Sequence, residues 1–320
     1  MTLRVAVTGI TGDVGRGAVQ GLKQNPFHEE PIWILGLDAS ADARSNVLID
    51  SFVQLPPVSD AHYVDALAGT LRINKIDILL PGVDTEIWVL SHARQRLAAT
   101  GSKVVLAPPE LVEAARDKLL TARYLESVGI QVPPTYEAET AEMEDLKYPM
   151  IAKPRVGHGS RGIEFLADRE AMQRFLCRQP PQYCVQRYIG GPEITVGFLY
   201  DSQGVMRDAI AMERFLEGGR TTRARTIEPP VILQFIENFG AKVRGSGAVN
   251  AQLRIDPREG PLVFEINARL SGSTDIRVSV GFNDPLRLVK HFGRGIPIAR
   301  AHPQRAIVRR IGTKILVSPC

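Results

Sequence analysis

A predicted β-hairpin over residues 250–269 constrains the fold most, because it gathers polar ligand atoms on one face of a sheet. The stretch reads NAQLRIDPREGPLVFEINAR, and Pro257 and Gly260 bracket a tight turn. Pairing that is symmetric about this turn sets Gln252 directly opposite Glu265. Strand side chains alternate between two faces, so we expect one apolar and one polar face. The predicted apolar face carries Leu253, Ile255, Leu262, Phe264 and Ile266, and the polar face carries Gln252, Arg254, Glu265 and Asn267.

The polar face of this hairpin predicts a magnesium site. The side-chain oxygens of Gln252, Glu265 and Asn267 are hard ligands of the kind that Mg²⁺ prefers, and the pairing brings them together. Arg269 follows at the strand exit, where its guanidinium would bind a phosphoryl group or a substrate carboxylate. An ordinary amphipathic hairpin with a solvated polar face fits the same alternation, so the hairpin alone leaves both interpretations open.

Size, charge and cysteine content exclude several other classes of protein. At 320 residues and 44% hydrophobic, the chain is long enough for two or three lobes with their own cores. The net charge of +4 is spread over interspersed charges, and no aromatic residues flank the most basic stretch, which argues against a nucleic-acid partner. Three cysteines without CxxC spacing indicate free thiols, and six histidines without a cluster argue against zinc. With no signal peptide and no membrane-length apolar run, we expect a cytoplasmic protein without a membrane partner.

The first hundred residues alternate strand and helix patterns, which predicts an α/β fold with a parallel sheet. Gly9, Gly12 and Gly15 follow the first strand, and Asp38 ends the second, as in a dinucleotide-binding fingerprint. One interpretation is therefore an NAD(P)-dependent epimerase or reductase. The other is a tight strand-to-helix turn that needs glycine for packing. No Tyr-x-x-x-Lys pair, the usual acid of such an oxidoreductase, is present.

The middle of the chain carries features that suit a nucleoside triphosphate. Lys153 ends a short apolar strand and leads into a loop with three glycines between residues 157 and 162, whose N–H groups could cover phosphates. Lys118 opens a helix and could reach the same phosphates. An edge-like strand around Gln186 offers backbone groups to an adenine ring, and Glu193 offers a carboxylate to ribose hydroxyls. A plain β-turn and a solvated lysine are the alternatives for the loop and for Lys118.

Taken in order, these pieces resemble the ATP-grasp superfamily, and in particular one synthetase half of the carbamoyl-phosphate synthase large subunit. The resemblance implies a Rossmann-like N-terminal (pre-ATP-grasp) domain at residues 1–108, followed by a two-lobed α+β ATP-grasp domain. Its small lobe, with a glycine-rich lid, would cover residues 109–190, and its C-terminal lobe, with the metal hairpin, residues 191–320. Gln186 and Gln252 stand where the family often has acidic residues, which leaves Glu265 as the only anionic metal ligand.

The resemblance also implies a role for each candidate site residue. Lys153 and Arg269 would be catalytic. Substrate contacts would come from Ser271 and from Arg220, Arg223 and Arg225 in a loop over residues 214–225. Magnesium would be held by Gln252, Glu265 and Asn267. The implied ATP-binding residues are Lys118, Lys153, Gly157, Gly159, Ser160, Gly162, Gln186, Tyr188, Ile189 and Glu193.

The expected activity is an ATP-dependent carboxylate–amine, or carboxylate–thiol, ligase that works through an acylphosphate and releases ADP and phosphate. Its cofactors would be ATP and Mg²⁺, its partners small-molecule carboxylate and amine substrates, and its assembly a homodimer. The chain carries one synthetase unit rather than two, so we do not expect it to make carbamoyl phosphate. The reductase and a non-catalytic nucleotide-binding protein are the alternatives.

Overall fold

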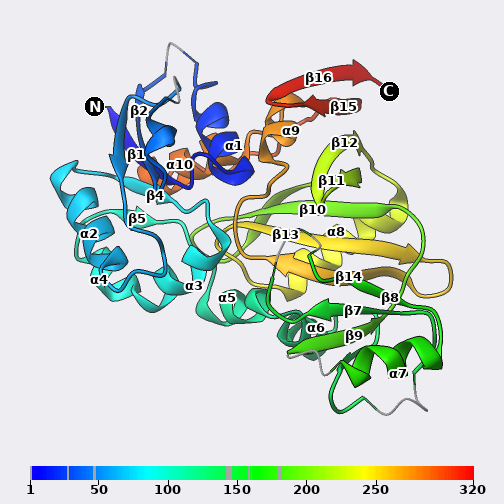
Figure 1. Ribbon diagram of the computed structural model, residues 1–320. Helices are drawn as coiled ribbons and strands as arrows, with labels where there is room; N and C mark the ends of the chain where they lie inside the picture. The colour runs from blue at the N-terminus through cyan, green and yellow to red at the C-terminus, as the bar shows by residue number, and fades with distance from the viewer. Residues whose placement is uncertain are drawn as a thin grey trace.

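The computed structural model describes residues 2–26, 29–45, 48–141, 146–157, 159, 161–178 and 182–320. These residues form a five-stranded, a four-stranded and a seven-stranded sheet, with helices packed around them (Figure 1). The five-stranded sheet lies at one end of the molecule and the four-stranded sheet at the other, with the seven-stranded sheet between them.

The first sheet consists of parallel strands that are buried on both faces. Its elements are β1 (Leu3–Thr8), α1 (Asp13–Leu22), β2 (Ile32–Asp38), the 3₁₀ helix η1 (Ala41–Ser45), β3 (Ser51–Gln54), α2 (Tyr63–Ile73), β4 (Ile78–Leu80), α3 (Asp84–His92), α4 (Arg94–Ala98) and β5 (Lys103–Val104). The strand order is β3-β2-β1-β4-β5. Ala6 and Leu79 face a core shared with α2 and α3, whereas Val5 and Ile78 face a core shared with α1. Two covered faces explain the apolar runs, and the predicted βα alternation is confirmed.

Two helices from the far end of the chain complete the cover of this first sheet. They are α9 (Thr274–Ser279) and α10 (Asp284–Arg294). Both pack against α1, and α10 also contacts β4. The Asn283 side chain donates a hydrogen bond to the Gly21 carbonyl at 2.9 Å, and Arg294 forms an ion pair with Glu30 at 2.7 Å. Residues beyond 270 therefore share a core with the N-terminal sheet.

The four-stranded sheet forms a small lobe around the predicted glycine loop. Its elements are β6 (Thr135–Glu137), β7 (Met150–Pro154), β8 (Glu164–Leu166), α7 (Arg169–Cys177) and β9 (Tyr183–Arg187). The strand order is β6-β9-β7-β8. The strand around Gln186, predicted to be edge-like, is therefore an inner strand, because β6 and β7 pair with its two edges.

The seven-stranded sheet is antiparallel and carries the predicted metal hairpin at one end. Its strands, with the helices that pack on it, are α5 (Pro109–Arg116), α6 (Lys118–Ser127), β10 (Glu193–Tyr200), β11 (Met206–Glu217), β12 (Arg220–Thr226), α8 (Pro230–Lys242), β13 (Gly247–Asp256), β14 (Gly260–Asn267), β15 (Ala306–Ile311) and β16 (Lys314–Pro319). The order is β14-β13-β10-β11-β12-β15-β16. Phe198 of β10 stacks on Phe239 of α8 with ring centres 4.4 Å apart, so α8 buries one face of the sheet. The stretch 214–225, predicted to be a loop, belongs to the β11–β12 hairpin.

A β-bulge changes the predicted faces of the β13–β14 hairpin. Gln252 pairs with Glu265 as predicted, but the register shifts at the next residue, so that Leu253 pairs with Val263. Phe264 is the extra residue of the bulge and has no partner on β13. Val263 therefore lies in the core beside Leu253. The prediction that Leu262 and Phe264 share that face is wrong, because strict alternation does not hold across a bulge.

No described residues form a helix long and apolar enough to cross a membrane. The cysteines are free thiols, with Cys184 buried and Cys177 and Cys320 exposed.

Candidate functional site

A cavity of about 1540 Å³ lies where the three sheets meet. Its walls come from the carboxyl ends of the first-sheet strands, from the small lobe and from the β11–β12 and β13–β14 hairpins. In open α/β sheets, ligands bind at the carboxyl ends where the strand order reverses, which here is between β1 and β4. Pockets for a single small molecule hold roughly 300–1,000 Å³. The cavity therefore has room for more than one ligand.

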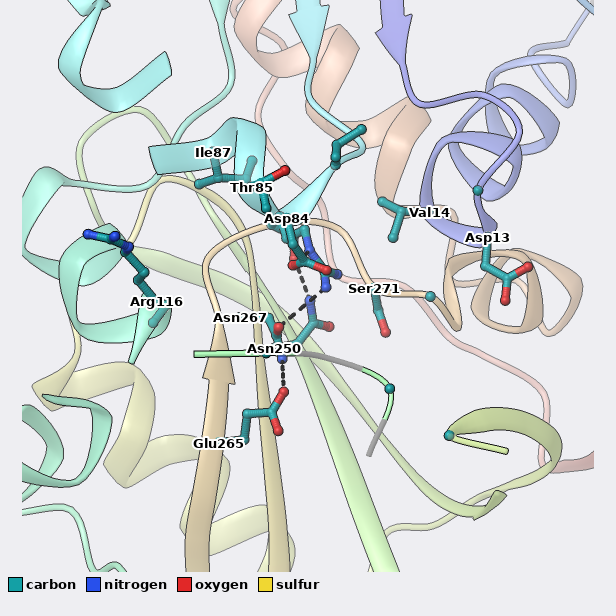
Figure 2. A pocket seen from close by; sticks show the side chains of 18 of the residues that line it. Asp13, Val14, Asp84, Thr85, Ile87, Arg116, Asn250, Glu265, Asn267 and Ser271 are labelled. Atoms are coloured by element: carbon teal, nitrogen blue, oxygen red, sulfur yellow. Dashed lines mark hydrogen bonds and ion pairs between the residues drawn. The ribbon is translucent and has the colours of Figure 1, made fainter. Parts of the chain in front are cut away.

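The three predicted metal ligands lie together on the cavity wall. The Glu265 carboxylate accepts a hydrogen bond from the side-chain amide of Gln252 at 3.4 Å. It accepts another from the side-chain amide of Asn267 at 3.2 Å (Figure 2). One carboxylate and two amide oxygens fit Mg²⁺, which commonly takes one or two protein carboxylates and completes its shell with water and phosphate oxygens. No three His, Cys, Asp or Glu side chains cluster for a metal in the described ranges. The donor chemistry therefore suits a cation that is shared with a phosphate.

Lys153 lies at the cavity wall with its side chain buried. Its Nζ donates a hydrogen bond to Gln186 Oε1 at 2.8 Å and lies 4.7 Å from the centre of the Phe264 ring. Burial lowers the pKa of the Lys153 ammonium to about 8, although the nearby Glu265 carboxylate acts in the opposite direction. The bulge turns Phe264 out of the core, and the Phe264 ring forms one wall of the pocket around the Lys153 ammonium. A phosphate placed here would stabilise the charged form.

Two glycines of the predicted phosphate loop line the cavity beside Lys118. Gly157 and Gly159 line the cavity, and the Lys118 ammonium donates to the Gly157 carbonyl at 3.1 Å. Gly162 is not among the described lining residues and packs against Tyr183. A Cβ added to Gly162 would lie 2.8 Å from the Tyr183 hydroxyl. Ser160, also predicted to bind ATP, lies outside the described residues.

The tip of this loop touches the β11–β12 turn. A Cβ added to Gly219 would fall 2.4 Å from the Gly159 carbonyl oxygen, so the two backbones are in close contact. Gly219 has φ +77°, which also favours glycine. Gly159 of the loop predicted to be a lid therefore lies against the β11–β12 turn.

The residues predicted to bind adenosine line one end of the cavity. Gln186, Tyr188, Ile189 and Glu193 are all among the lining residues. The Gln186 amide is used within the protein, since its nitrogen donates to Thr135 Oγ1 at 2.8 Å and its oxygen accepts from Lys153. The Tyr188 N–H donates to the Pro149 carbonyl at 3.0 Å. The backbone that could meet an adenine edge therefore starts later than predicted, at Ile189.

Glu193, the predicted ribose ligand, is held by two arginines that also line the cavity. Arg214 Nε donates to its carboxylate at 2.9 Å, and Arg254 lies 3.6 Å from it. A ribose hydroxyl would share the carboxylate with these guanidinium groups. Sequence reasoning did not assign Arg214 or Arg254 to the site, although Arg254 stood on the predicted polar face.

Arg269 crosses from the metal hairpin to the N-terminal domain. Its guanidinium donates to Asp84 at the start of α3, to the Leu270 carbonyl at 2.7 Å and to Asn267 Oδ1 at 3.3 Å. Figure 2 labels Asp84 and Asn267 on the two sides of this contact. Asp84 was not predicted as a site residue, because nothing in the sequence relates it to a residue 185 positions away. Ser271, also a cavity residue, accepts a hydrogen bond from the Ser273 N–H at 3.1 Å.

The three arginines proposed as substrate contacts do not lie together. Arg220 lines the cavity and donates two hydrogen bonds of 2.8 Å to Asp13. Arg223 lies 4.8 Å from the Phe215 ring centre, and Arg225 forms an ion pair with Glu213. Neither of these two is among the described lining residues. Arg223 and Arg225, two residues apart on β12, share one face of the strand, and each contacts the β11 residue with which it pairs.

The glycines of the first turn are explained by packing. A Cβ on Gly15 would fall 2.4 Å from the Gly9 carbonyl oxygen, so the helix and strand approach too closely for a side chain. Asp38 accepts hydrogen bonds from the Thr11 N–H and hydroxyl at 3.0 and 2.9 Å. Asp13 occupies the first position of α1, where a dinucleotide would place its pyrophosphate, and its carboxylate is bound there by Arg220. This geometry disfavours the NAD(P) interpretation.

Two family models match the chain. Residues 115–273 match the model described as ATP-grasp domain, and residues 16–105 match the model described as PylC-like, N-terminal domain.

Curated proteins and solved structures agree with these matches. The C-terminal section of the carbamoyl phosphate synthase large chain of Methanopyrus kandleri is 26% identical over 197 residues, which cover 55% of this chain and 36% of that protein. The chain thus spans about a third of that relative's length. N5-carboxyaminoimidazole synthetase from Staphylococcus aureus, solved with ADP, superposes with a TM-score of 0.77 at 16% identity, covering 97% of this chain and 82% of that one. L-amino acid ligase from Bacillus licheniformis gives 0.71 at 16% identity, covering 98% and 80%.

Proposed function

We propose that this chain, which belongs to the ATP-grasp superfamily, is an ATP-dependent ligase. It would join a carboxylate to an amine through an acylphosphate intermediate. The observation that carries the proposal is that Lys153, the Gln252–Glu265–Asn267 set and Arg269 all line one cavity. The similarity to a synthetase solved with ADP and to an amino acid ligase supports it.

The arrangement answers the central physical problem of this chemistry, which is repulsion between anions. A carboxylate must approach a triphosphate that carries about four negative charges, and such reactions are catalysed mainly by positioning and by neutralising charge. Lys118 and Lys153 would bind the phosphates, and Arg269 would bind the transferring phosphoryl or the acceptor carboxylate. Magnesium bound at Glu265 would withdraw charge from the phosphate oxygens.

The reaction would proceed in two balanced steps. A carboxylate oxygen forms a bond to the γ-phosphorus while the bond to the β–γ bridging oxygen breaks, and ADP leaves. The amine nitrogen then forms a bond to the acyl carbon while the carbon–oxygen bond to phosphate breaks. The amine proton leaves with the phosphate as hydrogen phosphate. The glycine loop, resting on Gly219, would keep water from the acylphosphate between the steps.

A substrate screen tests this function directly. The full chain with MgATP is given pairs of amino acids, and phosphate release is measured with and without hydroxylamine, which traps acylphosphates as hydroxamates. We expect ADP, phosphate and a hydroxamate with at least one carboxylate. MgATP should also raise the melting temperature more than NADPH does. Binding of MgATP without any turnover, or stronger stabilisation by NADPH, would overturn the proposal.

Glu265→Ala tests the metal site. The variant should lose ATP turnover by at least about a hundredfold, because the only carboxylate of the donor set is removed, while the melting temperature changes little. Glu259→Ala is the matched control, since Glu259 lies on the same hairpin, is 43% exposed and pairs with Arg187. Equal activity in both variants would exclude Glu265 as a metal ligand, and unfolding of the Glu265 variant would point to a structural role instead.

We also propose that the protein works in the cytoplasm as a homodimer. The free cysteines agree with a reducing compartment. The outer strand β16 exposes Leu316 and Val317, as a strand covered in an assembly would. Sedimentation equilibrium tests the assembly, and a monomer at all concentrations would exclude the dimer.

A further inference from the structure

We propose that Arg277, with its buried partner Asp284, is a positioning residue that fixes Arg269 in the site by way of the Asn250 side chain. The inference rests on the proposed ligase function, in which Arg269 binds the transferring phosphoryl or the acceptor carboxylate. It extends that function to side chains that act on Arg269 from the protein core and touch no substrate themselves.

Arg277 is a charged residue of α9 that is buried almost completely. Its side chain is 1% exposed, and its Nη1 lies 3.3 Å from the equally buried Oδ2 of Asp284 at the start of α10. The Nε of Arg277 and the Oδ1 of Asp284 have no hydrogen-bond partner among the described residues. A buried ion pair often stabilises a fold no better than apolar side chains of the same volume. The presence of Arg277 therefore calls for a reason other than packing.

The guanidinium of Arg277 reaches the large sheet and ends against Asn250 of β13. Its Nη2 donates a hydrogen bond to Asn250 Oδ1 at 2.6 Å. On the neighbouring strand β10, Gly197 is the ladder partner of Asn250, and a Cβ there would fall 2.2 Å from Arg277 Nη1. The guanidinium thus fills the space that a side chain on β10 would need.

Asn250 relays this contact to Arg269 because the two ends of its amide differ. The amide nitrogen donates to the backbone carbonyl of Arg269, while the amide oxygen accepts from Arg277. A guanidinium has only donors and a carbonyl has only acceptors, so one orientation of the amide satisfies both neighbours. Without Arg277, nothing at the oxygen end would oppose a half-turn of the amide. Arg277 therefore selects the orientation that holds Arg269.

The Arg269 backbone needs such an anchor because it lies beyond the end of β14 at Asn267. Asn250 pairs with Asn267, and Figure 2 shows the two side by side between Glu265 and Asp84. The Arg269 side chain bonds to Asp84 and Asn267, so a shift of its backbone would move the guanidinium relative to the metal ligands. A displacement of about 1 Å in such a group can slow a reaction about a hundredfold.

Two simultaneous substitutions remove the guanidinium without leaving a buried charge. Arg277→Met with Asp284→Leu, called the neutral swap below, replaces both partners by apolar side chains, which buried ion pairs often tolerate. Arg287→Met with Asp208→Leu is the matched control, because this ion pair of 2.6 Å also joins α10 to the large sheet. Neither member of the control pair is among the described cavity residues. Asn250→Ala removes the relay itself.

The Nε–H group of Arg269 reports on its position without any substrate. Its nuclear magnetic resonance signal is assigned by its loss in Arg269→Lys, and the exchange of its hydrogen with solvent is measured in the full chain. The contact with Asp84 protects this hydrogen. In the neutral swap and in Asn250→Ala we expect exchange to be faster by about 10- to 100-fold, the size of a hydrogen bond to a charged group.

The control pair should leave this exchange rate close to that of the wild type. Unchanged exchange in the folded neutral swap would overturn the proposal, and so would equal acceleration in the control, which would show a general loosening. If the neutral swap does not fold, Asn250→Ala decides, because unchanged exchange in that variant would remove the relay on which the proposal depends.

Kinetics with the substrates found in the screen separate positioning from nucleotide binding. The neutral swap and Asn250→Ala should each lower kcat by about 10- to 100-fold and leave the KM for MgATP nearly unchanged. Combining all three substitutions should lower kcat no further, because Arg277 acts only through Asn250. Losses that multiply, or a loss confined to KM, would refute the relay.

The two proposals fail in different ways. A wild-type chain that forms no ADP, phosphate or hydroxamate refutes the ligase, while the exchange of the Arg269 hydrogen still decides whether Arg277 positions that residue. Wild-type turnover and wild-type exchange in the neutral swap refute the positioning role and leave the ligase intact.

Discussion

The buried ammonium of Lys153 predicts that nucleotide affinity falls as the pH rises above neutrality. Burial lowers its pKa to about 8 in the free protein, and the anionic phosphates of ATP bind the protonated form. The protonated fraction is about nine-tenths at pH 7 and about one-tenth at pH 9. Apparent affinity scales with this competent fraction, so the dissociation constant should rise about tenfold between the two pH values.

The sign follows from linkage. A ligand that binds the protonated form raises the pKa of Lys153, so the protein takes up protons on binding near pH 8. Isothermal titration calorimetry with a non-hydrolysable MgATP analogue, repeated in buffers of different ionisation enthalpy, measures both the affinity and the uptake. We expect about half a proton at pH 8 and little at pH 6.5.

Lys153→Arg is the control, because a guanidinium stays charged throughout this range. Its affinity for the analogue should be lower overall but flat between pH 7 and pH 9. A flat profile in the wild-type protein, without proton uptake, would refute the reasoning. It would show that Lys153 is already fully protonated in the free protein or is not in contact with the nucleotide.

Two further outcomes follow from contacts in the structure. Gly219→Ala should raise the KM for MgATP several-fold, because its Cβ would meet the Gly159 carbonyl at 2.4 Å. Gly218→Ala is the control, since Gly218 is also at positive φ but has open space around its Cβ, and it should lose similar stability without the change in KM. Equal KM values for the two variants would exclude a lid contact. Asp284→Ala should lower the free energy of unfolding in urea by about 3–5 kcal/mol, because it leaves the Arg277 guanidinium, 1% exposed, without its buried carboxylate partner. A loss below about 1 kcal/mol, the size typical of surface pairs, would show that water reaches this site.

The sequence predicted the parts of the site that depend on local periodicity. Alternation and a turn between Pro257 and Gly260 were enough to set Gln252 opposite Glu265, which the ladder confirms. The same alternation failed one residue later, because a bulge depends on what the strand packs against. Phe264 turns toward Lys153, and no local pattern reveals that lysine's position.

Contacts between distant segments were beyond the sequence. Asp84 follows a short apolar strand and looks like an ordinary first-turn acid of a helix, and only the fold brings Arg269 to it. Arg223 and Arg225 show the reverse case, in which clustering along the chain suggested a common role. Strand geometry instead gives them separate partners, the Phe215 ring and Glu213.

The return of α9 and α10 to the first sheet has a consequence for anyone who cuts or recombines this chain. A fragment that stops at residue 273 contains every nucleotide and metal ligand proposed above, yet it lacks Ile276, Leu288 and Val289, which share one core with Val7 and Leu22 of the N-terminal domain. Conversely, an N-terminal fragment ending near residue 108 lacks the same three residues. Grafts between relatives should therefore transfer residues 274–294 together with the N-terminal domain, whatever their position along the chain suggests.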